Sequence, residues 1–288
     1  MRYAITGASG YVGHAFVREV ERRGGQPVEL GRRPSRPGGE YLPYTLGATD
    51  PDTIGWGGVE ALIHGAYDFR LTDPQEIGRI NVEGSVRLLQ SAHRHGVRRG
   101  VFISSFSAFE GCRSHYGRAK LRIEAEALRL GYAVVRPGLV FGGQPGGTMG
   151  SLWKVTAISP VLPLIGDGSY PQYLVHEDDL AAFVCGLCES GEPLPGRPLS
   201  AANPERVPLR EVIRRIAARQ GKRVLLFPVP WPLVLGGARL LEALRLPSPF
   251  RSDSLIGLVY QNPAPDFTLP PGVAASFRPF QATPEARP

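Results

Sequence analysis

This sequence of 288 residues has few cysteines, no long apolar run and no block of like charge. No apolar run reaches the ~18 residues of a membrane-spanning helix, and Met1 leads directly into a predicted strand, so we expect neither a membrane span nor a signal peptide. The three cysteines, Cys112, Cys185 and Cys188, are too few for a disulfide framework. These absences favour a cytoplasmic protein without a membrane partner.

The charge of the chain is positive but dispersed. Lys and Arg number 33 against 26 for Asp and Glu, which gives a net charge of +7, and no basic stripe is interleaved with aromatic residues. Nucleic acid is therefore not an expected partner, and a charged small molecule such as a phosphate-bearing ligand explains the charge equally well. Cys185 and Cys188 form a lone C-x-x-C without a second pair or a His cluster, so we predict buried thiols and no metal site.

A glycine-rich loop lies between a predicted strand and a predicted helix. Residues 2–6 have a strand pattern, Gly7, Gly10 and Gly13 follow in the spacing G-x-x-G-x-x-G, and a helical apolar face begins at Val12. Glycines allow backbone N–H groups to approach phosphates, and the helix N-terminus adds partial positive charge. The sequence therefore predicts the pyrophosphate site of a dinucleotide.

The end of the next predicted strand, residues 27–30, bears on which dinucleotide binds. An NAD enzyme usually has Asp or Glu beside the adenosine ribose, whereas arginine suits the 2′-phosphate of NADP. Here the strand is followed by Gly31, Arg32 and Arg33, and Glu29 shares a face with Gly31 only if the strand runs that far. The sequence thus favours NADP, with NAD as the second choice.

Strands and helices alternate through the first two thirds of the chain. Further strands are predicted at 59–64, 100–105 and 133–136, and helices at 75–95 and 118–130. This alternation predicts an α/β fold, a Rossmann-type doubly wound parallel sheet, with ligands at the carboxyl ends of its strands. We expect an NAD(P)-binding domain at 1–145, to which 174–200 return, and a small C-terminal substrate-binding annex with a lid at 146–173 and 201–288.

Beyond Gly142 the composition changes. Residues up to about 173 are rich in Gly and Pro and are expected to form a loop-rich lid with a short helix around Trp153. A helix should open at Asp178 with His176 as a structural partner. The annex should contain a helix from Pro208, a strand at 224–227 and a helix at 233–244, followed from about 272 by a loose tail.

Tyr116 and Lys120 form the candidate catalytic pair. Residues at i and i+4 share one helix face, and a nearby cation favours the phenolate. Because free tyrosine titrates near ~10, we expect Lys120 to lower the pKa of Tyr116 toward the range useful for general acid/base chemistry. An amphipathic helix also produces this spacing by chance. The predicted dinucleotide site at the glycine loop favours a catalytic role for the pair more strongly than the spacing alone does.

Several motifs occur in an order that resembles the extended short-chain dehydrogenase/reductase superfamily, in its NAD-dependent epimerase/dehydratase branch. They cover roughly the first two thirds of the chain: Thr6–Gly13, Asn81–Gly84, Ser104-Ser105, Tyr116-x-x-x-Lys120, Arg136–Gly142 and Val175–Ala181. The resemblance implies that Tyr116 is the general acid/base and that Lys120 holds the nicotinamide ribose. It further implies that Ser105 binds the reacting oxygen and that Asn81 supports Lys120.

The resemblance also implies a set of cofactor-binding residues along the glycine loop, the end of the second strand and the groove above the sheet. Besides Tyr116 and Lys120 this set is Gly7, Ser9, Gly10, Tyr11, Val12, Gly13, Arg32, Arg33, Gly65, Ala66, Pro137 and Val140.

The chain departs from the family pattern in three places. Alignment from Gly111 puts Phe106 in the catalytic serine position, whereas the strand favours Ser105, with Ser104 and Ser107 as alternatives. The usual adenine-contacting Gly-Asp-Leu is absent, since 45–48 read Thr-Leu-Gly-Ala. The Thr-Asp-Glu of sugar dehydratases is absent as well, which argues against dehydration.

Three functions remain open from the sequence. The first is an NAD(P)-dependent oxidoreductase that acts at a secondary alcohol or ketone of a nucleotide-sugar or similar polar metabolite. The second is a nucleotide-sugar epimerase that recycles bound NAD, and the third is a non-catalytic cofactor-binding structural or sensing subunit. The substrate and the oligomeric state stay open, with a homodimer among the alternatives.

Overall fold

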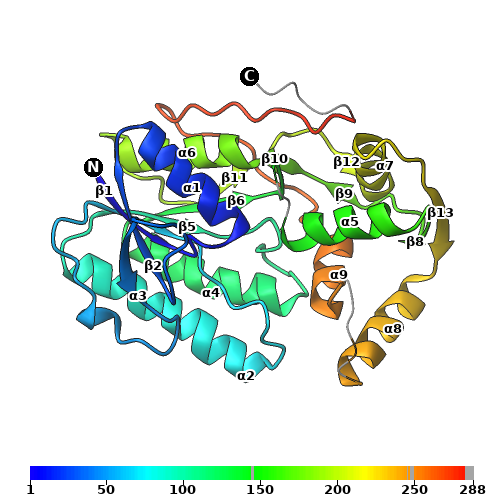
Figure 1. Cartoon of the computed structure of the whole chain (residues 1–288), viewed down its shortest axis with the longest axis horizontal. Coiled ribbons are helices and arrows are strands. Elements are labelled where there is room, and N and C mark those ends of the chain that lie inside the picture. Colours follow the sequence, from blue (N-terminus) through cyan, green and yellow to red (C-terminus); the bar gives the residue numbers. More distant parts are fainter. Residues whose placement is uncertain (144–145, 245, 247–249, 283–288) are drawn as a thin grey trace.

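The computed structural model of the chain describes residues 1–143, 146–244, 246 and 250–282. At its centre is a seven-stranded sheet in the order β11-β6-β5-β4-β1-β2-β3, in which every pairing is parallel (Figure 1). Its strands are β1 (Arg2–Thr6), β2 (Gln26–Gly31), β3 (Glu40–Pro43), β4 (Ala61–His64), β5 (Arg99–Ile103), β6 (Ala133–Pro137) and β11 (Leu199–Ala201). The strand order reverses between β1 and β4, so the predicted doubly wound parallel sheet is confirmed.

Helices cover both faces of this sheet (Figure 1). One layer contains α1 (Tyr11–Arg22) and α6 (Glu177–Glu189), and the other contains α3 (Gly84–Arg94) and α4 (His115–Arg129). Short segments η1 (Pro51–Thr53), α2 (Pro74–Glu76) and η2 (Ile77–Glu83) precede α3. Side chains alternate between the layers: in β4, Leu62 packs with the α3/α4 core and Ile63 with the α1/α6 core. A parallel sheet covered in this way leaves its carboxyl edge for ligands.

Helix α4 begins earlier than the predicted 118–130 because Ser114 caps it. The Ser114 hydroxyl accepts a hydrogen bond from the Gly117 amide at 3.0 Å. Tyr116 therefore lies in the first turn of α4, one turn before Lys120. The predicted helix at 75–95 is present, but its N-terminal part is the π-helical segment η2, which contains Asn81.

The rest of the chain forms further elements around a second core. Two of them, β7 (Leu139–Phe141) and β10 (Leu174–His176), lie in the ranges expected for the NAD(P)-binding domain. The lid and annex ranges contain α5 (Gly147–Ile158), β8 (Val161–Ile165), β9 (Pro171–Gln172), β12 (Val207–Pro208), α7 (Leu209–Arg219), β13 (Leu225–Val229), α8 (Trp231–Ala243) and α9 (Ser252–Val259). The helix expected around Trp153 is present as α5, but the segment is less rich in loops than expected, since α5 has 12 residues and the strand β8 follows it. Leu152 and Leu164 pack there with Ile216 of α7, and this apolar core orders the segment.

The C-terminal tail is docked rather than loose as far as the structure describes it. Arg278 forms an ion pair with Asp179, Arg215 donates to the Phe280 carbonyl at 2.6 Å, and Phe280 is buried. Part of the predicted tail, 283–288, lies outside the described residues. Of the helices that the structure describes, none combines the length and apolar character needed to cross a membrane.

The thiols of Cys185 and Cys188 lie on α6 in the core between α1 and the sheet. Burial raises the pKa of Cys185 to about 12, and raises that of Cys188 as well. Both are therefore small core side chains. Within the described ranges, no cluster of three or more His, Cys, Asp or Glu could hold a metal ion.

Candidate active site

The loop between β1 and α1 approaches its neighbours so closely that glycine is required. Gly7 has a φ of 74°, and a Cβ at Gly13 would lie 2.0 Å from the Gly7 carbonyl oxygen. Gly10 immediately precedes α1, no side chain caps that helix, and its first turn has no acidic residue. The helix N-terminus thus offers amide groups and partial positive charge at the sheet edge. This arrangement fits the pyrophosphate of a dinucleotide.

A buried hydroxyl joins the two strands that flank the topological switch point. Thr6, at the end of β1, accepts hydrogen bonds through Oγ1 from the amides of Gly65 and Ala66 at 3.2 and 3.1 Å. The same Oγ1 lies 2.6 Å from Nδ1 of His64. Because both lone pairs are used, the Thr6 hydroxyl donates to Nδ1, and burial lowers the pKa of His64 to about 3. Sequence reasoning did not single out Thr6 or His64, although both end strands at the ligand edge.

The end of β2 places a buried carboxylate and two exposed cations side by side. The strand does run to Gly31, but the Glu29 carboxylate accepts hydrogen bonds from the Ser35 amide at 2.7 Å and from Arg36 Nε at 3.0 Å. Glu29 is 2% exposed, and its two hydrogen bonds hold the turn that follows β2. Arg32 and Arg33 are exposed just beyond the strand.

Tyr116 lies among other rings beside Ser105. The Tyr116 ring is 5.0 Å from that of Tyr67 in an edge-on arrangement and 5.5 Å from that of Phe69. Burial raises the pKa of Tyr116 to about 12, and a side-chain hydrogen bond with Ser105 opposes this rise. The Ser105 hydroxyl also accepts from the Ser107 amide at 3.1 Å, which fixes its orientation.

Lys120 lies beneath this group and is 2% exposed. Its ammonium donates to the Ile103 carbonyl at 2.7 Å and lies 5.6 Å from the centre of the Tyr116 ring. Burial lowers the pKa of Lys120 to about 7, although the charge of Glu124 opposes this effect. The expectation that Lys120 lowers the pKa of Tyr116 is wrong for this geometry, because burial of the phenol dominates and the lysine proton is directed to a β5 carbonyl.

Ser104, an alternative for the catalytic serine, takes part in a structural hydrogen-bond network. Its hydroxyl donates to Glu124, whose carboxylate also receives two hydrogen bonds from Arg136 at 2.9 and 2.6 Å. Ser104 and Glu124 are both buried. Of the two serines that follow β5, Ser104 is therefore engaged by Glu124, whereas Ser105 is the one whose hydroxyl influences the pKa of Tyr116.

Asn81 is fully buried in η2 but does not bond Lys120 through its side chain. Its Oδ1 accepts from the Asp68 amide at 2.7 Å, and its Nδ2 donates to the Asp68 carbonyl at 3.2 Å. The side-chain amide of Asn81 is therefore engaged by the loop that follows β4 and carries Tyr67.

The other predicted cofactor residues line the same carboxyl edge. Ser9, Tyr11 and Val12 lie at the start of α1, Gly65 and Ala66 follow β4, Pro137 ends β6, and Val140 lies in β7. Residues from four separate segments are thus brought to one side of the sheet. His176 caps α6 by accepting a hydrogen bond from the Asp178 amide at 3.2 Å, in the structural role expected for it.

Sequence reasoning also missed Asp253. This annex residue accepts hydrogen bonds from the amides of His115 and Tyr116, the first residues of α4. No local pattern in the sequence signals such a contact, because the partners are 137 residues apart.

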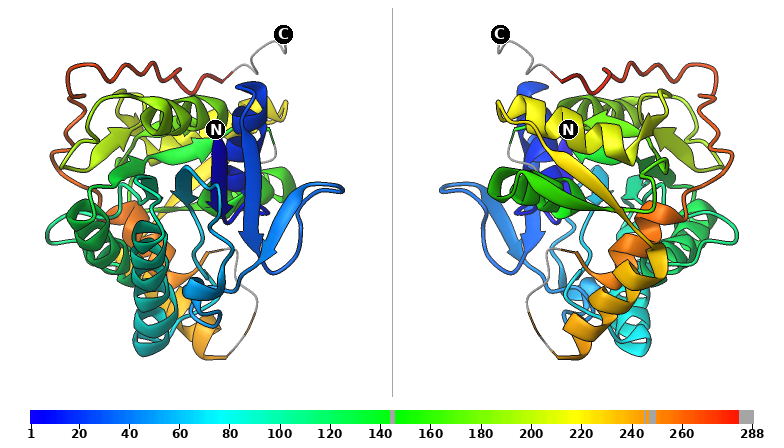
Figure 2. Two further views of the ribbon diagram at one scale, coloured as in Figure 1. Left: turned by 90° about the vertical axis from the view of Figure 1, so that its left-hand side faces the viewer. Right: turned by 90° about the vertical axis from the view of Figure 1, so that its right-hand side faces the viewer.

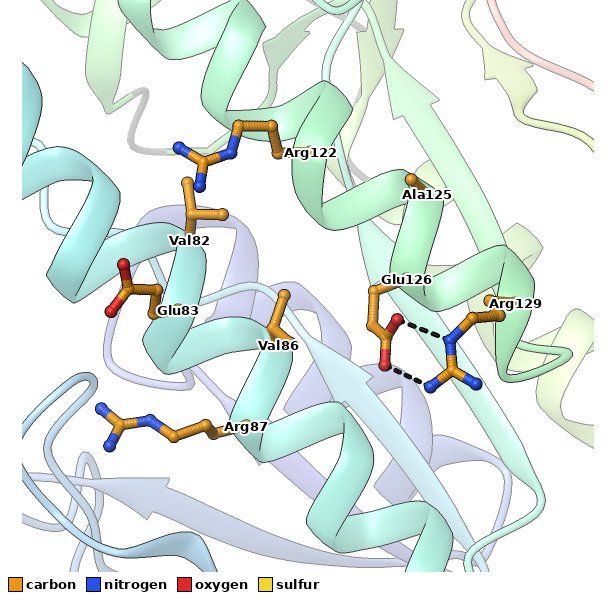
Figure 3. A pocket seen from close by; sticks show the side chains of 8 residues that line it. All are labelled: Val82, Glu83, Val86, Arg87, Arg122, Ala125, Glu126 and Arg129. Carbon is orange, nitrogen blue, oxygen red and sulfur yellow. Dashed lines mark hydrogen bonds and ion pairs between the residues drawn. The ribbon is translucent and has the colours of Figure 1, made fainter.

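A surface groove of about 570 Å³ lies elsewhere, between α4 and the η2/α3 segment (Figure 3). Its lining combines Val82 and Val86 with charged residues such as Arg87, Arg122 and the Glu126–Arg129 ion pair. None of the predicted catalytic or cofactor-binding residues is among its 8 lining residues. The groove is therefore distinct from the candidate active site.

The glycine loop at the switch point, together with the Ser105–Tyr116–Lys120 group, defines a dinucleotide-dependent enzyme of the short-chain dehydrogenase/reductase class. The chain belongs to the NAD-dependent epimerase/dehydratase family, whose model matches residues 3–197. Its chemistry is accordingly that of an NAD(P)-dependent oxidoreductase or epimerase.

Relatives of the chain fall within this chemistry. It is 29% identical over 250 residues to the ceramide reductase of Caulobacter vibrioides, an alignment that covers 83% of this chain and 77% of the relative. It is 25% identical over 294 residues to the dTDP-4-dehydro-6-deoxy-D-allose reductase of Streptomyces bikiniensis, with 84% and 88% covered. Among solved structures, MoeE5 in complex with UDP-glucuronic acid and NAD is similar in fold, with a TM-score of 0.67, 21% identity and coverage of 80% and 86%.

Proposed function

We propose that this chain is an NADP(H)-linked reductase that converts a ketone of a small-molecule substrate into a secondary alcohol. The observation that carries the proposal is the meeting of Ser105, which follows β5, and Tyr116, in the first turn of α4, with the buried Lys120 5.6 Å from the centre of the Tyr116 ring. These are the groups that a carbonyl reduction needs for proton donation and for stabilisation of the developing oxyanion.

The proposed roles follow from the placement of each side chain. Bound NADPH supplies the hydride. Tyr116, whose raised pKa keeps the phenol protonated at neutral pH, donates its proton to the substrate oxygen, and Ser105 hydrogen-bonds the same oxygen. Lys120 lies one helical turn after Tyr116, donates to the Ile103 carbonyl of β5, and would hold the nicotinamide ribose.

The preference for NADP is supported by the end of β2. Glu29 is engaged by Ser35 and Arg36, while Arg32 and Arg33 are exposed where a 2′-phosphate would lie. Titration of the purified chain should give an NADPH affinity about tenfold above that for NADH. Arg32→Ala with Arg33→Ala should remove this difference, whereas Arg87→Ala on α3 should keep it. Equal affinities in the unaltered chain would contradict the assignment.

Two substrate classes deserve the first assays. A nucleotide-sugar is suggested by the dTDP-linked name of one relative, and a lipid ketone by the name ceramide reductase of another. The exposed ring of Phe69 near Tyr116 offers an apolar surface that suits the second class. With the correct substrate, absorbance of the reduced nicotinamide should fall in proportion to the product formed.

The epimerase alternative predicts a different result in the same assay. An epimerase must keep its dinucleotide because the hydride returns to the same intermediate, whereas a reductase releases it after each turnover. We expect the purified chain to be largely free of dinucleotide by mass spectrometry after denaturation. Retained NAD, with a substrate isomerised and no net absorbance change, would replace the reductase by an epimerase.

A further inference from the structure

The annex carries an apolar sheet face that nothing in the described chain covers. Strands β8 and β13 pair in parallel, with Leu225 opposite Val161 and Phe227 opposite Pro163. The alternate residues of β8, Leu162 and Leu164, are buried, so the other face points outward. Parallel sheets are normally covered on both faces. Here Val161, Leu225 and Phe227 are 46%, 67% and 44% exposed.

Further apolar side chains are exposed on the neighbouring helices. Ile158 at the end of α5 is 83% exposed, and α8, which follows β13 after one residue, exposes Leu233 and Leu240. Strand β13 and helix α8 face the same side of the molecule in the right-hand view of Figure 2. We call Ile158, Val161, Leu225, Phe227, Leu233 and Leu240 the annex surface. An exposed apolar patch of this kind marks an interaction site.

The charge around the annex surface is mainly positive. Residues 151–166 and 212–241 together contain seven Lys and Arg and no Asp or Glu, although one of the seven, Arg215, pairs with Glu205 and Glu211. Lys154 lies one turn before Ile158, Lys222 donates to the Ala157 carbonyl, Arg223 precedes Leu225 by two residues, and Arg239 adjoins Leu240; all four are exposed. The nearest acid on α8, Glu242, is directed to Ser252 of α9, and Asp167 lies beyond the far end of β8.

We propose that the annex surface docks on an anionic lipid bilayer. Apolar side chains rimmed by cations match the acyl and headgroup layers of such a membrane. A second copy of the chain is a poorer occupant, because a symmetric contact would place each cationic rim on its equivalent in the partner. This proposal departs from the sequence expectation of no membrane partner, which rested on the absence of a membrane-spanning run.

The surface is connected to the candidate active site through the fold. Helix α8 packs against α9, and Asp253 of α9 caps the helix that carries Tyr116. The docking inference does not rest on the proposed reaction, however, and its test uses no turnover.

The test is co-sedimentation of the full chain with vesicles of phosphatidylcholine alone or mixed with phosphatidylglycerol. We expect binding to the mixed vesicles that weakens with salt, and much weaker binding to the neutral ones. The double variant Lys154→Glu with Arg223→Glu should weaken binding to the mixed vesicles by a factor of about ten or more. The matched control is Arg79→Glu with Arg87→Glu, two exposed arginines on η2 and α3. It makes the same charge change and should retain most of the binding.

The apolar part of the surface has its own variant. Leu225→Ser with Phe227→Ser should also release the chain from mixed vesicles, with the fold retained in circular dichroism because both side chains are already exposed. The inference is overturned if the unaltered chain does not bind the mixed vesicles, or if the control variant loses as much affinity as Lys154→Glu with Arg223→Glu. A dimer in light scattering that this serine variant dissociates would overturn it as well.

Discussion

The backbone amide of Tyr116 donates a hydrogen bond to Asp253 at 3.0 Å, and the same carboxylate accepts another from His115 at 2.7 Å. Asp253 lies in the first turn of α9, so an annex carboxylate caps the N-terminus of α4 and interacts favourably with its dipole. The position of the predicted proton donor thus depends on the annex.

Replacement of this carboxylate tests that dependence. Asp253→Ala should lower the free energy of unfolding by about 1 kcal/mol and reduce kcat more than it reduces NADPH affinity, because the amides of His115 and Tyr116 lose their acceptor while the Ser114 cap remains. Asp50→Ala, which removes the cap of η1, is the control and should affect stability alone. Urea unfolding and steady-state kinetics measure the two effects. Equal losses of kcat in both variants would reject a positioning role for Asp253.

The second prediction concerns the proton donor itself. Tyr116→Phe should lower kcat by a factor of about 10² to 10⁴, since only the phenolic oxygen is lost, and should leave the Kd for NADPH nearly unchanged. Lys120→Met should impair both, because Lys120 is expected to hold the nicotinamide ribose. Fluorescence titration and single-turnover kinetics separate the two effects. Turnover that survives Tyr116→Phe at the original rate would place catalysis elsewhere.

The two adjacent serines should respond differently to substitution. Ser105→Ala removes the hydroxyl that bonds Tyr116, so we expect kcat to fall by a factor of about ten or more with little change in stability. Ser104→Ala removes a donor to the buried Glu124 and should cost about 1–3 kcal/mol of stability while kcat is largely kept. The reverse outcome would assign the catalytic role to Ser104.

The buried His64 should make stability depend on pH. Its pKa in the folded chain is about 3, below the usual 6.5, so between these values the unfolded chain binds more protons and stability falls as the pH falls. From pH 7.5 to pH 5, His64 alone should account for a loss of about 2 kcal/mol.

Carboxylates titrate at similar pH, so the comparison is with His64→Asn, which keeps an acceptor for Thr6. Unfolding by urea at each pH measures both proteins. An identical pH dependence in the two would show that His64 is not buried in its neutral form.

The sequence alone was sufficient for the parts of the protein that depend on local geometry. Strand and helix periodicity predicted the parallel sheet, and the spacing of Gly7, Gly10 and Gly13 predicted a tight turn before α1, because backbone sterics act over a few residues. The spacing of four residues between Tyr116 and Lys120 likewise placed both side chains on one helix face. The family motifs lie on these same local elements.

Only the tertiary structure decided which partners meet across long distances in the chain. It directed Ser105 rather than Ser104 to Tyr116, engaged Glu29 in the turn after β2, and brought Asp253 to the start of α4. It also left the side chains of Leu225 and Phe227 exposed to solvent, although apolar residues at alternate positions of a strand usually face a core. Hydrogen bonds and burial depend on the neighbours that folding brings together, and residue type and local spacing do not specify those neighbours.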